Sequence, residues 1–220
     1  MTKDNEQIKK DVIEKLYWDS RVDASNIRID INDGEIILMG TVPNYTAKQA
    51  AWHDALLING VEGVHDRISV KYPASALAPA DDELKNNVKT MLSLSSSIDS
   101  VEIEVTVENG KVILCGSVDS YWKKVKAEDL VFDIIGVTDV INKLTVIPTG
   151  DFFDRDIAKD IIKNYDRIAN IESEDINVKV ENGVVTLTGN VSDWTTKDTV
   201  INFAHLTPGV KDVIDYINVA

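Results

Sequence analysis

The chain has 220 residues, of which 44% are hydrophobic and 27% charged, a composition that suits a soluble protein with buried cores. Its net charge of −14 disfavours nucleic-acid binding, and it weakens attraction to an anionic membrane unless a local basic patch overrides the repulsion. A single cysteine excludes an internal disulfide, and no stretch approaches the roughly 18 apolar residues of a membrane-spanning helix.

The first predicted element is an amphipathic helix near the N-terminus. Ile8, Val12 and Leu16 recur every four residues with Lys, Asp and Glu between them, which is typical of a helix that buries one face. The same pattern returns twice further along the chain, at Leu84, Val88 and Leu92 and at Ile157, Ile161 and Tyr165.

A hairpin follows each of these helices. Alternating apolar residues flank a turn dipeptide in each copy, and such a dipeptide favours a type I′ turn because both of its residues can adopt positive φ. Two more glycines follow each turn glycine at fixed spacings. The three dipeptides are Asp33-Gly34, Asn109-Gly110 and Asn182-Gly183, and the further glycines are Gly40, Gly60, Gly116, Gly136, Gly189 and Gly209. We expect all nine glycines to serve backbone geometry.

A second helix and a third strand complete each copy. The helix lies between the second and third glycines, and the strand follows the third glycine in the strings GVEGVHDRISV, GVTDVINKLTV and GVKDVIDYINV. A right-handed crossover makes the third strand parallel to the second. The sequence therefore predicts an α+β chain of three tandem αββαβ domains, each a three-stranded mixed sheet with two helices on one face. The predicted domain limits are 1–72, 79–148 and 151–220, with a Pro/Ala-rich linker over 72–82.

The most distinctive surface candidate is the start of the second helix in the middle copy. Tyr121 and Trp122 are followed by Lys123, Lys124 and Lys126, the most concentrated basic run of the chain. Aromatic rings beside lysines are typical of contact with lipid headgroups. The corresponding stretches keep the aromatic residue, as Tyr45 and Trp194, but not the charge. The alternative is that each aromatic covers its own core and the lysines are a solvated first turn.

No pattern in the sequence predicts catalysis. The three histidines are far apart and lack metal-ligand spacing, and Cys115 has no neighbouring base. The glycines do not follow the order of a phosphate-binding loop. We therefore expect no enzymatic activity, no catalytic residue, no metal and no cofactor.

The hairpin glycine, the glycine that closes the second strand and the terminal GVxxVxNxLxV string resemble the BON domain. The string GVTDVINKLTV of the middle copy is the closest, with Asn142 at the polar position where the other copies have Asp66 and Asp215. The resemblance covers the whole chain three times and implies the αββαβ fold.

The resemblance also implies a non-enzymatic binding module of bacterial stress or envelope maintenance. Its expected partners are phospholipid surfaces or, in a chaperone-like role, protein clients, engaged through three linked modules, with no nucleic acid. The alternative is a cytosolic potassium-binding or osmotic-stress sensor, with carbonyl oxygens at the glycine turns as ligands. The chain as written has no signal peptide, which predicts a cytoplasmic location, or a periplasmic one if it is a processed mature form.

Overall fold

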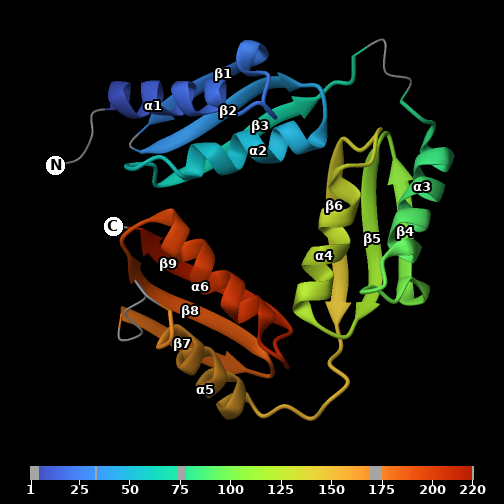
Figure 1. Ribbon diagram of the computed structural model, residues 1–220, viewed down its shortest axis with the longest axis vertical. Helices are drawn as coiled ribbons and strands as arrows, with labels where there is room; N and C mark the ends of the chain where they lie inside the picture. The colour runs from blue at the N-terminus through green and yellow to red at the C-terminus, as the bar shows by residue number, and fades with distance from the viewer. Residues whose placement is uncertain (1–4, 33, 74–77, 169–174, 220) are drawn as a thin grey trace. The chain divides into compact units, whose positions relative to one another are not determined.

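A computed structural model describes residues 5–32, 34–73, 78–168 and 175–219 of the chain. It contains three copies of the order helix, strand, strand, helix, strand (Figure 1). The first copy comprises α1 (Asn5–Trp18), β1 (Ile27–Asn32), β2 (Glu35–Val42), α2 (Tyr45–Leu56) and β3 (Gly63–Val70); the second α3 (Asp81–Leu94), β4 (Ile103–Glu108), β5 (Lys111–Val118), α4 (Tyr121–Phe132) and β6 (Asp139–Val146); the third α5 (Asp154–Tyr165), β7 (Ile176–Glu181), β8 (Val184–Val191), α6 (Trp194–Leu206) and β9 (Asp212–Val219). This confirms the predicted fold class.

Each copy has its own sheet of three strands with the second strand in the middle. The orders are β1-β2-β3, β4-β5-β6 and β7-β8-β9. In the first and third sheets the first two strands are antiparallel and the last two parallel, as the right-handed crossover predicts. Short 3-10 helices precede β1 and β4, at Ala24–Asn26 and Ser100–Glu102.

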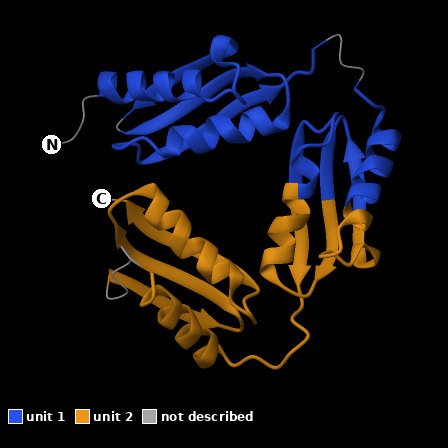
Figure 2. Cartoon of the chain, in the orientation of Figure 1, with its two compact units in different colours: residues 1–91, 105–113, 130–141 blue, residues 92–104, 114–129, 142–220 orange. Residues whose placement is uncertain are grey.

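The chain divides into two compact units, drawn in separate colours in Figure 2. One unit consists of residues 1–91, 105–113 and 130–141, and the other of residues 92–104, 114–129 and 142–220. The boundary between the units runs through the second copy, so the limits expected for the three domains stay a prediction. Four linker residues, 74–77, and the turn residue Asp33 lie outside the described part of the chain.

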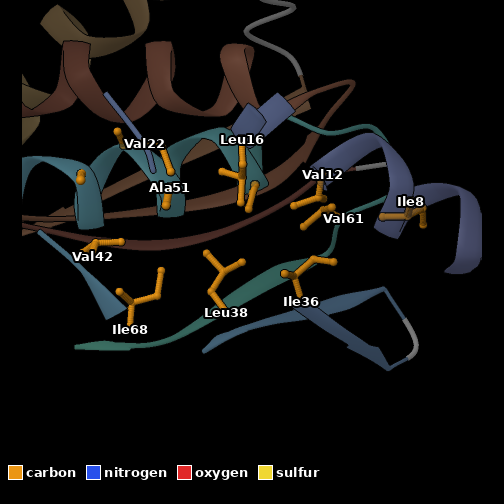
Figure 3. Close-up of a cluster of buried hydrophobic side chains, with 13 residues drawn as sticks. Ile8, Val12, Leu16, Val22, Ile36, Leu38, Val42, Ala51, Val61 and Ile68 are labelled. Atoms are coloured by element: carbon orange, nitrogen blue, oxygen red, sulfur yellow. The ribbon is translucent and has the colours of Figure 1, made fainter. Parts of the chain in front are cut away.

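The core of the first copy lies between its two helices and one face of its sheet (Figure 3). Ile8, Val12 and Leu16 of α1 are all buried, which confirms the predicted helix face. They meet Ile36 and Leu38 of β2, whose alternation directs these side chains to the covered face. The opposite face of the sheet has no helix over it within the copy, and the side chains there are mostly polar and partly or fully exposed.

A carboxylate at the start of the first helix holds the hairpin turn in two of the copies. The Asp81 side chain accepts hydrogen bonds from the amides of Asn109 and Gly110, at 2.7 and 3.0 Å. Asn109 and Gly110 both have positive φ, 52° and 76°, as a type I′ turn requires. Asp154 binds the third turn in the same way, at 2.7 and 2.8 Å.

The second glycine of each copy faces a different constraint, because a Cβ at Gly40 would collide with the carbonyl oxygen of Asn26.

The turn carboxylate gives a first test of how each copy is stabilised. We predict that Asp154→Ala lowers the stability of the third copy by about 1–2 kcal/mol, because two turn amides lose a charged acceptor. Hydrogen exchange of the β7 and β8 amides should accelerate accordingly. Asp156→Ala is the matched control, since Asp156 shares the first helical turn and the dipole effect but does not bind the turn. Equal acceleration in both variants would contradict this role.

Candidate functional site

The aromatic residue at each second helix occupies the same local position in all three copies. Tyr45, Tyr121 and Trp194 are the first residues of α2, α4 and α6. The preceding residue caps the helix in two copies: the Asn44 side chain accepts a hydrogen bond from the amide of Ala47, and the Asp193 side chain accepts one from the amide of Thr196. The cap therefore fixes where the chain turns into the helix, and the aromatic side chain leaves from that turn.

Two of these aromatic rings contact the end of the corresponding helix in the next copy. Within the first compact unit, the Tyr45 ring lies 5.1 Å from that of Phe132 and is 4% exposed. Within the second unit, Tyr121 stacks on His205 with 4.3 Å between ring centroids. Phe132 and His205 are equivalent positions, since each lies 11 residues after its helix-start aromatic. The Tyr45 and Tyr121 rings thus join successive copies, a role that the sequence analysis did not foresee.

A lysine follows each helix-start aromatic by three residues, so the expectation that only the middle copy keeps a positive charge was wrong. Lys48, Lys124 and Lys197 lie over the rings of their own copies, with 5.9, 5.6 and 4.8 Å from Nζ to the centroid. At these separations each lysine is positioned for a cation–π interaction. The three-residue spacing between the aromatic residue and the lysine is present in the sequence of every copy. It is less conspicuous than the run of three lysines after Trp122.

The lysines of the outer copies are also bound to the third strand. Lys48 forms an ion pair with Asp66 at 3.3 Å, and Lys197 forms one with Asp215 at 2.8 Å. In the middle copy Asn142 replaces the aspartate and donates to the backbone oxygen of Lys124 at 2.7 Å. The polar position of the GVxxVxNxLxV string therefore ties the third strand to the second helix in every copy. Within the described ranges Lys124 has no salt bridge.

The remaining residues of the predicted contact surface are only partly available to a ligand. The Lys123 ammonium is paired with Asp119 at 2.7 Å and lies 5.8 Å from the Trp122 ring. Trp122 is 36% exposed and Lys126 is exposed. A ligand approaching α4 would therefore meet Trp122 and Lys126 first, and the assignment of a contact to this helix stays a prediction.

The most exposed aromatic side chains of the described chain lie elsewhere, at the end of α1. Tyr17 and Trp18 are 76% and 80% exposed, and their rings form an edge-to-face pair at 5.9 Å. Ile13, one turn earlier, is also exposed. The sequence contained a signal for this pair, because Tyr17 and Trp18 fall outside the four-residue period of Ile8, Val12 and Leu16.

A buried carboxylate fixes the last turn of α1 against α2. Asp54 is 2% exposed and pairs with Lys15 at 3.2 Å. Burial raises the pKa of Asp54, while the ion pair with Lys15 opposes that rise. Nearby, Arg21 forms a salt bridge with Asp19 at 2.5 Å and holds the pKa of that carboxyl well below its usual range. The exposed aromatic pair is therefore carried by a helix end with several fixed charges.

The turn carbonyls proposed as potassium ligands are already engaged. Those of Gly34, Gly110 and Gly183 each accept a backbone hydrogen bond from the segment that leads into the third strand, at 2.9, 2.9 and 2.8 Å. Across the described residues, no group of three or more His, Cys, Asp or Glu side chains could hold a metal ion. No described helix has the length and apolar character to cross a membrane.

The repeated fold and the shared site geometry agree with a comparison against known families. The model of the BON domain matches residues 4–72, 80–148 and 153–220. The chain belongs to the BON domain family. Its three BON domains lie in tandem and cover nearly the whole sequence.

Several curated proteins are similar to parts of the chain. Outer membrane lipoprotein DolP of Haemophilus influenzae is 31% identical over 110 residues, which is 50% of this chain and 56% of DolP. The match thus spans about half the length of that relative. An uncharacterized protein in the gshII 5′ region of Anaplasma centrale is 31% identical over 120 residues, 52% of this chain and 80% of that protein. A 21 kDa hemolysin of Actinobacillus pleuropneumoniae is 24% identical over 147 residues, 66% and 75% of the two chains.

Among solved structures, the chain is similar to CdsD, a structural protein of the type III secretion system of Chlamydia trachomatis. The match has 16% identity and covers 97% of this chain and 92% of CdsD, with a TM-score of 0.27. A TM-score this low supports no argument about function.

The stack of Tyr121 on His205 gives a testable pH dependence. Burial lowers the pKa of His205 from 6.5 to about 4, with Asp212 opposing the shift. His205 binds a proton more weakly in the folded protein than in the unfolded chain, so protonation favours unfolding. The folded protein therefore keeps its full stability above pH 6.5 and loses part of it as the pH falls towards 4. We predict a loss of about 1–2 kcal/mol between pH 7 and pH 5.

Thermal unfolding across this pH range measures the loss. His205→Phe, which copies the Phe132 of the second BON domain, should remove most of the difference between pH 7 and pH 5. The same pH dependence in the wild type and the variant would show that His205 does not cause it.

Proposed function

We propose that this chain is a non-enzymatic module that binds phospholipid surfaces through the exposed apolar edge of α1. The observation that carries the proposal is the placement of Ile13, Tyr17 and Trp18 on the outside of a helix whose opposite face is buried in the first domain. A helix of this kind lies in the membrane interface with its apolar side chains among the acyl chains and headgroups. Trp and Tyr side chains favour that depth because their rings are apolar and their edges polar.

The distribution of charge also favours the first domain as the part of the chain that contacts the phospholipid surface. Residues 1–80 contain 9 basic and 12 acidic residues, whereas residues 151–220 contain 7 and 13. Since residues 81–150 contain 7 basic and 12 acidic residues, the first domain is repelled least of the three by an anionic surface, and the exposed Lys10 lies one turn before Ile13. DolP, one of the relatives, is named an outer membrane lipoprotein, which supports a role at the bacterial envelope.

The predicted surface on α4 is a second candidate contact. Trp122 and Lys126 are exposed there, in a domain separate from α1. Two weak contacts on one chain would strengthen each other, because binding through one raises the effective concentration of the other at the membrane.

Co-sedimentation with phospholipid vesicles tests the proposal. We expect the wild type to pellet with vesicles containing an anionic phospholipid, and Tyr17→Ala/Trp18→Ala to reduce the bound fraction at least fivefold, because both exposed aromatic rings at the end of α1 are lost. Trp122→Ala/Lys126→Glu should have a smaller effect. Tyr216→Ala is the control, since Tyr216 is 64% exposed in the third domain.

Three outcomes would count against the proposal. They are no pelleting with any vesicle composition, unchanged pelleting of the α1 variant, and an equal loss in the Tyr216 control. Circular dichroism confirms that each variant remains folded before its binding is compared.

A further inference from the structure

The outer strands of the three sheets differ in the charges they present. In each sheet the middle strand has two neighbours, whereas the outer strands have one. An outer strand with unpaired backbone groups can pair with a strand of another chain unless its side chains prevent it. Two of the outer strands, β3 of the first domain and β4 of the second, carry charges of opposite sign.

The exposed side chains along β3 form a basic row. Arg67, Ser69 and Lys71 alternate with the inward-facing Ile68 and Val70, and all three are exposed. The strand pairing continues to the end of this row, because the amide of Lys71 donates to the carbonyl of Val42 at 2.8 Å.

The exposed side chains along β4 form the acidic counterpart. Glu104, Thr106 and Glu108 are exposed, while Ile103 and Val105 between and before them are buried. In both the β3 row and the β4 row, two charged side chains flank a hydroxyl side chain, and successive members of the row are two residues apart. Among the described residues, Arg67, Lys71, Glu104 and Glu108 have no salt bridge that would occupy these charges.

The topology fixes how two such edges would meet. In the first and third domains the first strand is antiparallel to the second and the third is parallel to it, and Figure 1 shows the same strand directions in the second domain. If β3 of one domain joins the first strand of another with both helix layers on the same side, the two joined strands run antiparallel. The pairs are then Arg67 opposite Glu108, Ser69 opposite Thr106 and Lys71 opposite Glu104. Opposite charges and hydroxyl pairs at directly facing positions stabilise a sheet.

No other combination of a third strand with a first strand offers this match. The rows equivalent to β3 are Lys143, Thr145 and Ile147 in the second domain and Tyr216 and Asn218 in the third. The rows equivalent to β4 are Arg28, Asp30 and Asn32 in the first domain and Asn177, Lys179 and Glu181 in the third. Every other antiparallel combination of a third-strand row with a first-strand row brings together at most one pair of opposite charges.

We propose that β3 of one copy of the chain pairs with β4 of a second copy, joining two sheets into one of six strands. Pairing within a single chain does not account for the match, because β3 and β4 belong to different sheets of the structure. Since each copy carries both edges, association is head-to-tail or reciprocal. Exposed ion pairs contribute little stability and are screened by salt, so the association is weak and sensitive to ionic strength.

Sedimentation velocity over a range of concentrations tests the proposal. The wild type should form species above the monomer mass as concentration rises, and these should diminish at high salt. Arg67→Glu/Lys71→Glu and Glu104→Lys/Glu108→Lys should each remain monomeric. The second variant has a less negative net charge than the wild type, so stronger overall repulsion would not explain its loss of association.

A mixture of the two variants gives the sharpest result. In the mixture each reversed edge meets the complementary edge of the other variant, so association should return. Arg155→Glu/Lys159→Glu, which makes the same net change as the β3 variant at exposed positions of α5, away from any strand edge, should associate nearly like the wild type. A wild type that stays monomeric at every concentration, or a mixture that stays monomeric while the wild type associates, would overturn the proposal.

Discussion

In the described part of the chain each BON domain covers its sheet with two α-helices, and this limited cover determines which surfaces stay outside the core. Both helices pack on one face, and the buried side chains of the first and third domains form one cluster in each. A domain of about 70 residues has little surface to bury, so precise local geometry must supply stability that a larger core would provide. The turn carboxylates of Asp81 and Asp154 and the close approach at Gly40 are such local devices.

The same constraint leaves distinct surfaces for binding. A single layer of helices leaves helix ends, the open sheet face and the two outer strands outside the core. The domains share the positions that make the fold but differ on these surfaces: Tyr17 and Trp18 belong to the first domain alone, and the basic and acidic edge rows to the first and second. Domains that share one fold but expose different side chains can therefore bind different partners.

Patterns of local origin allowed the fold to be predicted from the sequence. Turn dipeptides and apolar periodicity depend on neighbouring residues, so the order of elements and the parallel third strand were confirmed. The contact of Tyr121 with His205 depends on residues 84 positions apart, and nothing in either local sequence indicates the other. For the same reason the sequence predicts a ligand contact for Tyr121 and does not indicate that the Tyr121 ring stacks on His205. The exposure of Tyr17 and Trp18 follows from their position off the buried face of α1, but no cluster of lysines marks this pair as the run after Trp122 marks α4.

The depth of Trp18 in a bilayer tests directly whether the first domain meets the membrane through the end of α1. A variant that keeps Trp18 as its one tryptophan, with Trp52→Phe, Trp122→Phe and Trp194→Tyr, is mixed with vesicles containing brominated acyl chains. Trp194→Tyr reproduces the residue at the equivalent positions 45 and 121. Contact through α1 should give strong quenching of Trp18 and weak quenching in a matched variant that keeps Trp194 alone. Quenching of Trp194 without quenching of Trp18 would contradict it.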